Sequence, residues 1–309
     1  MDKVRIGTRG SALALWQARE VARLLREAHP GLEVEEQIFK TRGDHILDRP
    51  LSEVGGKGLF TKELEVALLA GEIDIAVHSL KDMPTVLPEG LSLGAIPRRA
   101  DARDVLLFRR GERPESMRVI GSSSLRRASL ARARWPEAEV VSIRGNVQTR
   151  IGRLFEEGER RVDGVILAMA GLLRLGLLDE PKEYESLPLN PERWTPAAAQ
   201  GALAIEQRAE DPEVSALLAP LHHSDTAVCV ESERAFLRAV EGDCRVPVGA
   251  WATVDQGRLR LKGFIGDLKG EELLCETRLG AAAAAVPLGA ELATELLAAG
   301  GAELLAKLR

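Results

Sequence analysis

Three short segments place a serine or an asparagine beside arginines where a helix is expected to begin. Residues 121–127 read Gly-Ser-Ser-Ser-Leu-Arg-Arg, residues 144–146 read Arg-Gly-Asn, and residues 7–11 read Gly-Thr-Arg-Gly-Ser. Backbone N–H groups at a helix start, hydroxyl groups and guanidinium groups all bind anions. Helix capping is the commoner role of Ser and Asn at such positions. Three such segments, each after an expected strand, favour a cleft that binds a polyanion.

The charge distribution agrees with a local anion site. Residues 98–150 contain 13 Arg, no Lys and 6 acidic residues, a net charge of +7 in a chain whose total is −5. A solvated basic surface is the alternative explanation. Aromatic side chains that could stack on bases are limited to Phe108 and Trp135 in this stretch, and the chain is acidic overall. We therefore expect no nucleic-acid partner.

Asp82 follows the apolar residues 73–77 and lies beside Lys81 and close to His78. An aspartate at the end of a strand is often a cap or a turn residue. It is also well placed to balance positive charge on a bound substrate. Spacing alone leaves both interpretations open.

The three cysteines are far apart and form no CxxC pattern, so neither a disulfide framework nor a metal site is expected. Cys229 and Cys275 lie in apolar patterns that predict buried core thiols. Cys244 differs because it stands in the loop 242–247, where it could be a nucleophile, a covalent anchor or a bystander. The N-terminus shows no apolar leader, and we expect a reducing, cytoplasmic compartment.

Residues 55–58 read Gly-Gly-Lys-Gly but do not form a Walker phosphate loop. That loop needs glycine at position 51 and serine or threonine at position 58, where this chain has Leu51 and Gly58. We interpret the segment as a mobile loop that contains Lys57.

Strand and helix patterns alternate along most of the chain, which is typical of the α/β class. We expect strands at residues 4–8, 34–39, 73–77, 105–108, 119–120, 140–143, 165–168 and 201–205. Two similar units, with a late strand returning to the first, would form a hinged cleft. From about residue 221 the pattern changes to a helix and an antiparallel meander at 248–254, 259–265 and 272–278.

These patterns predict three domains: residues 1–98 with 200–219, residues 99–199, and a small α+β domain at 220–309. The composition, 45% hydrophobic and 29% charged, is that of a globular protein. No apolar run approaches the ~18 residues of a membrane helix, so no membrane span is expected.

Taken together, these motifs resemble the porphobilinogen deaminase (hydroxymethylbilane synthase) family over essentially the whole chain. The matching segments, in family order, are GTRGSALALWQA, TRGD, VGGKGLFTKELE, DIAVHSLKDMP, GSSSLRR, RGNVQTR, AGLLRLG, QGALAIE and EGDCRVPVGA. The resemblance implies two periplasmic-binding-protein-like (type II) α/β domains and a small third domain. It also implies a transferase that joins four porphobilinogen molecules head to tail, with loss of ammonia, for tetrapyrrole biosynthesis. The linear product would be released by water and passed by a monomeric enzyme to a cyclising synthase.

The resemblance further implies a covalent dipyrromethane cofactor, attached through a thioether to Cys244, and a catalytic role for Asp82. Besides these two residues, it assigns cofactor binding to Lys81, Ser123, Ser124, Arg126, Arg127 and Arg144. Substrate binding falls to Arg9, Ser11, Phe60, Arg144, Arg150, Arg174 and Gln200, and Lys57 belongs to the mobile loop. Glu53, where some members have lysine, and Gln148, where others have glycine, depart from the family pattern. A non-catalytic ligand-binding module is the main alternative, and it would not need Cys244.

Overall fold

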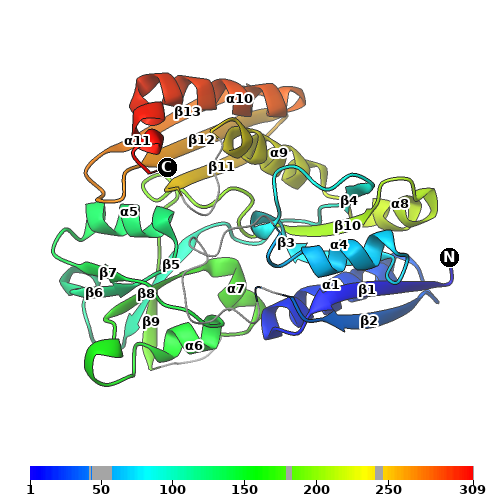
Figure 1. Cartoon of the computed structure of the whole chain (residues 1–309), viewed down its shortest axis with the longest axis horizontal. Coiled ribbons are helices and arrows are strands. Elements are labelled where there is room, and N and C mark those ends of the chain that lie inside the picture. Colours follow the sequence, from blue (N-terminus) through cyan, green and yellow to red (C-terminus); the bar gives the residue numbers. More distant parts are fainter. Residues whose placement is uncertain (42, 44–57, 179–182, 241–245, 309) are drawn as a thin grey trace. The chain divides into compact units, whose positions relative to one another are not determined.

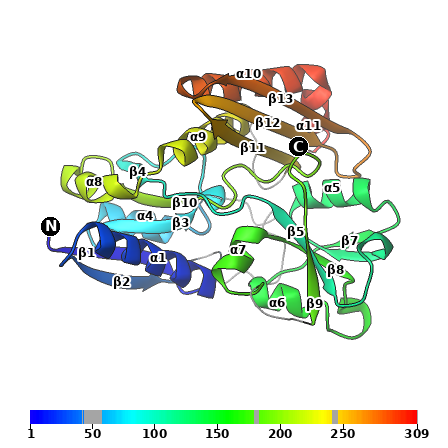
Figure 2. The ribbon, with the colours of Figure 1, turned by 180° about the vertical axis from the view of Figure 1, so that it is seen from behind.

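The computed structural model describes residues 1–41, 43, 58–178, 183–240 and 246–308. The chain divides into two compact units. The described part of unit 1 comprises residues 1–41, 43, 58–100 and 201–227, and that of unit 2 comprises residues 101–178, 183–200, 228–240 and 246–308. Figures 1 and 2 show the elements of both units from two sides.

Unit 1 is built on a five-stranded sheet with the order β2-β1-β3-β10-β4. Its strands are β1 (Lys3–Arg9), β2 (Glu33–Phe39), β3 (Ile75–Ser79), β4 (Leu91–Ala95) and β10 (Leu203–Arg208). β1 runs parallel to β2 and β3, whereas β10 runs antiparallel to both β3 and β4. The helices are α1 (Ala12–Ala28), α4 (Lys62–Leu69), α8 (Pro212–Leu218), and the 3₁₀ turns η1 (Leu80–Asp82) and η4 (Ala219–Leu221).

Both faces of this sheet are covered by helices. Ser11 caps α1, since its hydroxyl accepts a hydrogen bond from the Ala14 N–H. The apolar stripe of α1 packs with α8 on one face, and α4 packs on the opposite face. Burial on both sides of the sheet explains why β3 begins with the continuous apolar run Ile75–Val77 rather than with an alternating pattern.

The α/β part of unit 2 repeats this plan with the strand order β7-β6-β8-β5-β9. The strands are β5 (Asp104–Arg109), β6 (Val119–Gly121), β7 (Glu139–Val141), β8 (Gly164–Ala168) and β9 (Tyr184–Pro188). Helix α5 (Leu125–Arg134) covers one face, and α6 (Val147–Gly152) and α7 (Met169–Arg174) cover the other. The short 3₁₀ turns are η2 (Pro114–Ser116) and η3 (Gly158–Arg160). β6 is parallel to β7 and β8, and β5 is antiparallel to β8 and β9.

The predicted α/β class and the pair of similar units are therefore confirmed, including the late strand that returns to the first sheet. Among the residues that the structure describes, two strands and one helix were not predicted. β4 reads Leu-Ser-Leu-Gly-Ala, and β9 is an edge strand whose residues are mostly exposed, so neither carries a clear apolar pattern. Helix α7 has only six residues and no side-chain cap, which leaves little signal in the sequence.

The C-terminal part of unit 2 is an antiparallel sheet of β11 (Val248–Asp255), β12 (Arg258–Gly266) and β13 (Leu273–Ala281), as the meander pattern predicts. Helix α9 (Ser224–Ala239), with its first turn in unit 1, packs on this sheet with α10 (Ala285–Leu296) and α11 (Ala302–Ala306). The remaining turns are η5 (Ala282–Ala284) and η6 (Leu297–Gly301). Cys229 is buried as expected, but Cys275 is exposed because β13 lies at the edge of its sheet.

Among the described residues, one helical segment, Ala282–Ala306, is apolar and long enough to cross a membrane by length and composition. The sequence analysis missed it because small alanines, not a run of large apolar residues, raise its hydropathy. Leu288, Leu292 and Leu296 of this segment are buried in the C-terminal core. Gly300, at φ 110°, interrupts the helical geometry. Core helices of this kind pass the same test, so the segment is weak support for a membrane span.

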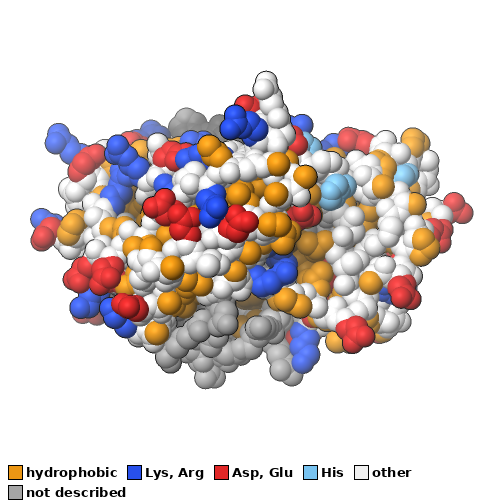
Figure 3. All heavy atoms as spheres, turned by 90° about the horizontal axis from the view of Figure 1, so that it is seen from above, with side chains coloured by type: hydrophobic (Ala, Val, Ile, Leu, Met, Phe, Trp, Pro, Cys, Tyr) orange, Lys and Arg blue, Asp and Glu red, His pale blue; other side chains and the backbone are white. Residues whose placement is uncertain are grey.

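The surface carries charges of both signs. On the face shown in Figure 3, acidic and basic side chains are interspersed rather than separated by sign. The boundaries proposed for three domains stay a prediction.

The packing of α10 against α9 in the C-terminal part depends on Gly289. A Cβ at this position would collide with the Ser232 carbonyl oxygen and lie 2.9 Å from the Phe236 nitrogen. We expect Gly289→Ala to lower the free energy of unfolding by about 1–3 kcal/mol, because α10 would be pushed away from α9. Gly152→Ala is the matched control, since no atom lies within 4 Å of its Cβ position. The control should be neutral or stabilising, and thermal unfolding of both variants tests the contrast.

Candidate active site

In unit 1 the carboxyl ends of two neighbouring strands hold several predicted site residues. β1 and β3 are parallel and adjacent, with Ile6 opposite Ile75. Arg9 ends β1, Ser11 follows as the cap of α1, and Lys81 and Asp82 follow the end of β3. The structure therefore brings Arg9, Ser11, Lys81 and Asp82 to one edge of the sheet.

Asp82 lies on the one-turn 3₁₀ helix η1 between two buried anchors. Leu80 and Met83 are both in the core, and the Leu80 N–H donates to the Ala202 carbonyl oxygen at 3.0 Å. Asp82 itself is exposed, and Lys81 is half-buried. A carboxylate fixed on a rigid turn and open to solvent is accessible to a ligand at this sheet edge.

Gln17 and Phe60 contact residues at this edge of the sheet. The Gln17 side-chain amide donates to Ser79 Oγ at 2.8 Å, which ties α1 to the residue before η1. The Arg9 guanidinium stacks over the Phe60 ring at 4.2 Å from its centroid. Phe60 and Arg9, both predicted substrate contacts, therefore touch each other. Lys57 and Glu53 lie outside the described residues.

In unit 2 three parallel strands, β7, β6 and β8, end at a common sheet edge. Ser122–Ser124 follow β6, and Ser124 caps α5 by accepting a hydrogen bond from the Arg127 N–H. Arg144 follows β7, and Asn146 caps α6 by accepting from the Thr149 N–H at 2.9 Å. The capping interpretation of Ser11, Ser124 and Asn146 is thus correct in all three segments.

Capping does not remove the serines from an anion site. A hydroxyl that accepts from a backbone N–H still has its own proton to donate, so Ser11 and Ser124 keep a donor for a carboxylate. Ser123 is different, because its hydroxyl donates to the Ile143 carbonyl oxygen and also contacts Ser142 Oγ. Ser123 consequently links the turn after β6 to the turn after β7.

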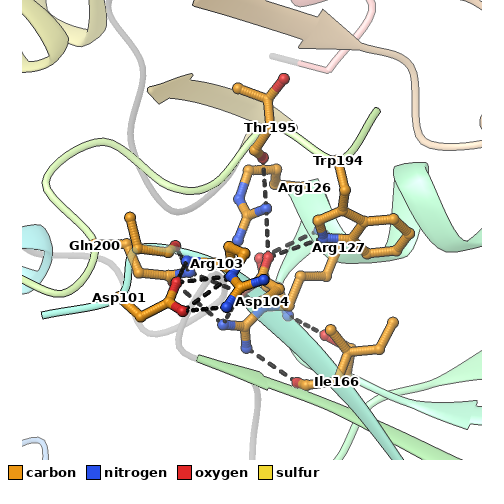
Figure 4. Close-up of polar contacts among 12 residues, drawn as sticks. Asp101, Arg103, Asp104, Arg126, Arg127, Ile166, Trp194, Thr195 and Gln200 are labelled. Carbon is orange, nitrogen blue, oxygen red and sulfur yellow. Dashed lines mark hydrogen bonds and ion pairs between the residues drawn. The ribbon is translucent and has the colours of Figure 1, made fainter. Parts of the chain in front are cut away.

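Arg126 and Arg127 were predicted to face a ligand, yet both guanidinium groups bind Asp104 (Figure 4). Arg126 Nη1 lies 2.8 Å from one Asp104 oxygen, and Arg127 Nη2 lies 2.7 Å from the other. Arg126 also donates to the Thr195 carbonyl oxygen, and Arg127 to that of Ile166. Arg126 and Arg127 are only 4% and 6% exposed.

Gln200 and Trp194 complete the contacts of Asp104. The Gln200 amide donates to Asp104 at 2.8 Å and to the Ala102 carbonyl oxygen at 2.8 Å, and the Trp194 indole N–H donates to Asp104 at 2.9 Å. Gln200, predicted as a substrate contact, is 0% exposed. Its side chain thus binds groups of unit 2 itself. The sequence analysis missed Asp104 and Trp194, although an aspartate that opens the buried strand DVLLF signals the need for a partner.

The arginines determine the ionisation of Asp104. Burial alone raises the pKa of this carboxyl, but the charges of Arg126 and Arg127 and their hydrogen bonds hold the pKa well below its usual value of 3.8. Burial also lowers the pKa of Arg126, yet a guanidinium starts so high that it stays protonated at neutral pH. The cluster of one carboxylate and two guanidinium groups therefore carries a net charge of +1.

The remaining predicted residues are spread along unit 2. Arg150 Nε donates to the Gly145 carbonyl oxygen at 2.9 Å, which holds its side chain beside the turn after β7. Arg174 is the last residue of α7 and is half-buried. Cys244 lies outside the described residues. No group of three or more metal-binding side chains gathers anywhere in the described part of the chain.

Fold and site together define an α/β protein whose two sheets share one pattern of parallel and antiparallel strands, each with cationic and hydroxyl groups at one edge. A family model described as "Porphobilinogen deaminase, dipyromethane cofactor binding domain" matches residues 4–216, and one described as "Porphobilinogen deaminase, C-terminal domain" matches residues 227–298. The chain belongs to the porphobilinogen deaminase family, whose members polymerise porphobilinogen into hydroxymethylbilane. The resemblance noted in the sequence is thereby confirmed.

Relatives named porphobilinogen deaminase match over nearly their whole length. The protein of Syntrophobacter fumaroxidans is 48% identical over 98% of this chain and 96% of its own length. That of Pelobacter propionicus is 49% identical over the same shares of the two chains. Among solved structures, the aliphatic sulphonate binding protein SsuA of Escherichia coli is 14% identical, covers 78% of this chain and 71% of its own, and has a TM-score of 0.40. A likeness at that level carries no argument here, and the fold class is based on the strand orders.

The ion pairs of Asp104 predict a specific acid sensitivity. Asp104→Asn should lose about 3–5 kcal/mol of unfolding free energy at pH 7, because two buried guanidinium groups lose their counter-charge. As the pH falls below about 4, the unfolded wild type takes up a proton at Asp104 while the folded protein does not, so the wild-type protein loses this advantage.

Urea unfolding of both proteins between pH 7 and pH 3 measures the effect. The difference in unfolding free energy between wild type and Asp104→Asn should become smaller below about pH 4. A difference that stays constant over this range would contradict an ionised Asp104.

Proposed function

We propose that this chain joins four porphobilinogen molecules head to tail into hydroxymethylbilane. At each step the aminomethyl C–N bond of one molecule breaks, its nitrogen leaves as ammonia, and a C–C bond forms to the previous pyrrole, which loses a proton. Water releases the linear product. The observation that carries the proposal is the match of both family models, which together span most of the chain.

The cationic residues of the described site suit the substrate. Each porphobilinogen carries an acetate and a propionate, so the chain gains two negative charges with every addition. Guanidinium groups bind carboxylates in a planar, two-pronged geometry. Arg9, Arg144, Arg150 and Arg174 are proposed to bind these groups, with Ser11 donating its hydroxyl proton.

Asp82 is proposed as the catalytic residue. Departure of ammonia leaves a positive charge delocalised over the pyrrole ring. A carboxylate held in place by the buried residues Leu80 and Met83 stabilises this charge without first having to reorganise. The same carboxylate can accept a hydrogen bond from a pyrrole N–H and so orient the ring.

The donor set also fits a dipyrromethane cofactor, which is itself made from two porphobilinogen units. Lys81, Ser124, Arg126, Arg127 and Arg144 supply ammonium, hydroxyl and guanidinium groups that match its carboxylates. When bound, the cofactor supplies the first pyrrole to which substrate units are added. Cys244 is proposed as its covalent anchor, and Ser123 contributes by fixing the turn between β6 and β7.

We place this activity in the cytoplasm, in a monomer that passes its product to a cyclising synthase. Phe60 and Lys57 are proposed to act in the loop near the substrate. Incubation of the purified chain with porphobilinogen tests the function directly: four ammonia molecules should be released for each tetrapyrrole. A preparation of folded chain that releases none would exclude the activity.

Replacement of Asp82 separates a catalytic carboxylate from a turn residue. Asp82→Asn keeps size and hydrogen-bonding capacity but removes the charge, and we expect a loss of about 10²–10³ in rate. Asp82→Glu keeps the charge but displaces it, and partial activity should remain. Because Asn serves well in turns, both variants should fold. Single-turnover kinetics decide, and activity of the Asn variant within a few-fold of wild type rejects the catalytic role.

The cysteines give a second prediction, measured by intact mass. Cys244→Ala should fold but carry no covalent pyrrole adduct. Cys229→Ala should keep the adduct and lose some stability, since Cys229 lies in the C-terminal core. Cys275→Ala should keep both the adduct and the stability of the wild type, because this thiol is exposed. An adduct on Cys229 or Cys275 in the wild-type chain would show that Cys244 is not the anchor.

A further inference from the structure

Asp104 stands at the start of β5 and receives hydrogen bonds from four side chains. One oxygen accepts from Arg127 Nη2 at 2.7 Å and from the Gln200 amide at 2.8 Å. The other contacts Arg126 Nη1 at 2.8 Å and accepts from the Trp194 indole at 2.9 Å. Asp104 is 0% exposed, so these partners stabilise its charge in place of solvent. Each carboxylate oxygen thus serves a different arginine.

The two arginines could not take this arrangement unaided. They are consecutive residues in the first turn of α5, and their like charges repel each other within the unit. Arginine side chains also have high rotamer entropy, which opposes a single fixed geometry. A buried carboxylate that bridges both groups removes the repulsion and selects one orientation for each.

We propose that Asp104 is the positioning residue of the anion site at the start of α5: it fixes the directions of Arg126 and Arg127 and reduces their joint charge to +1. This inference rests on the proposed function, in which both arginines bind carboxylates of the cofactor. A site with one net charge still binds an acidic ligand. Because the two guanidinium groups are held in fixed directions, it binds that ligand more tightly than two guanidinium groups free to turn would.

Trp194 and Gln200 keep Asp104 itself in place. Trp194 packs edge-on against Trp135 at 6.1 Å in the core of unit 2, and its N–H is directed at Asp104 (Figure 4). Arg126 donates to the carbonyl oxygen of Thr195, the residue after Trp194. One short segment, Trp194–Gln200 in sequence, therefore contacts both Asp104 and the arginines that it orients.

The test follows loading, the step in which the apoprotein acquires its covalent cofactor from porphobilinogen. Intact mass measures the fraction of chains that carry the cofactor. If Arg126 and Arg127 are positioned by Asp104, Asp104→Asn should raise the half-saturating porphobilinogen concentration for loading by about 10–100-fold. Comparable losses follow when a residue that orients a metal ligand is removed. The loading rate at saturation should change much less, because the reacting groups are intact.

Asp163→Asn is the matched control for lost stability. Asp163 also lies in unit 2, accepts from the Arg118 and Val119 N–H groups, and pairs with Arg109 at 3.3 Å. It stands at the amino end of β6, away from the turn that leads to α5. This control should unfold more easily than wild type yet load normally.

The outcomes are distinct. If the wild-type chain acquires no adduct, the proposed function is wrong, whatever Asp104 does. If wild type loads and folded Asp104→Asn loads with a half-saturating concentration within twofold of it, the positioning role is wrong and the function stands.

If Asp104→Asn does not fold, Trp194→Phe decides. This variant keeps all charges and an aromatic ring against Trp135, and it removes the indole donor to Asp104 together with part of the ring volume. A rise of about three- to tenfold in the half-saturating concentration, larger than for Asp163→Asn, supports the proposal. A lower melting temperature with unchanged loading overturns it.

Discussion

A buried carboxylate between two guanidinium groups is the contact on which unit 2 depends. Asp104 opens the interior strand β5, and removing its carboxylate from water is unfavourable unless both oxygens are fully paired. The chain meets this requirement with residues from two regions: Arg126 and Arg127 at the start of α5, and Trp194 and Gln200 beyond β9. The requirement fixes where α5 begins relative to the sheet. It thereby also fixes the capping serines that precede the helix.

In the described part of unit 1, other contacts lie near the carboxyl ends of β1 and β3. Arg9 at the end of β1 stacks on Phe60, and a hydrogen bond from Gln17 to Ser79 links α1 to the residue before η1. Asp82 is consequently left exposed at the end of β3. The same pattern of strand directions therefore supports a buried carboxylate in one unit and an accessible one in the other, which suits a structural role for Asp104 and a chemical role for Asp82.

Much of the fold and of the candidate site could be predicted from the sequence, because strand ends and helix caps depend on neighbouring residues. An apolar run before Asp82 places it at the end of a strand, and Ser11, Ser124 and Asn146 carry their capping role in their immediate context. The partner of Arg126 could not be predicted, since Asp104 is 22 positions away and no spacing rule links a strand start to a helix start. The exposure of Cys275 could not be predicted either, because it also depends on residues that are distant in sequence. Its strand has an apolar pattern, but only the sheet order shows that β13 is an edge.

The net charge of residues 98–150 is interpreted differently once the ion pairs of its arginines are known. The +7 of residues 98–150 suggests that many arginines face a ligand. Within unit 2, however, Arg103 pairs with Asp101, Arg109 with Glu112 and Asp163, and Arg126 and Arg127 share Asp104. A charge that is already balanced at 2.6–2.8 Å by a neighbouring carboxylate adds little to the attraction of a distant anion. What such an arginine offers a ligand is geometry: N–H groups that are held in position before the ligand arrives. Affinity for a growing acidic chain then depends on how the pairs are arranged rather than on how many arginines the segment contains.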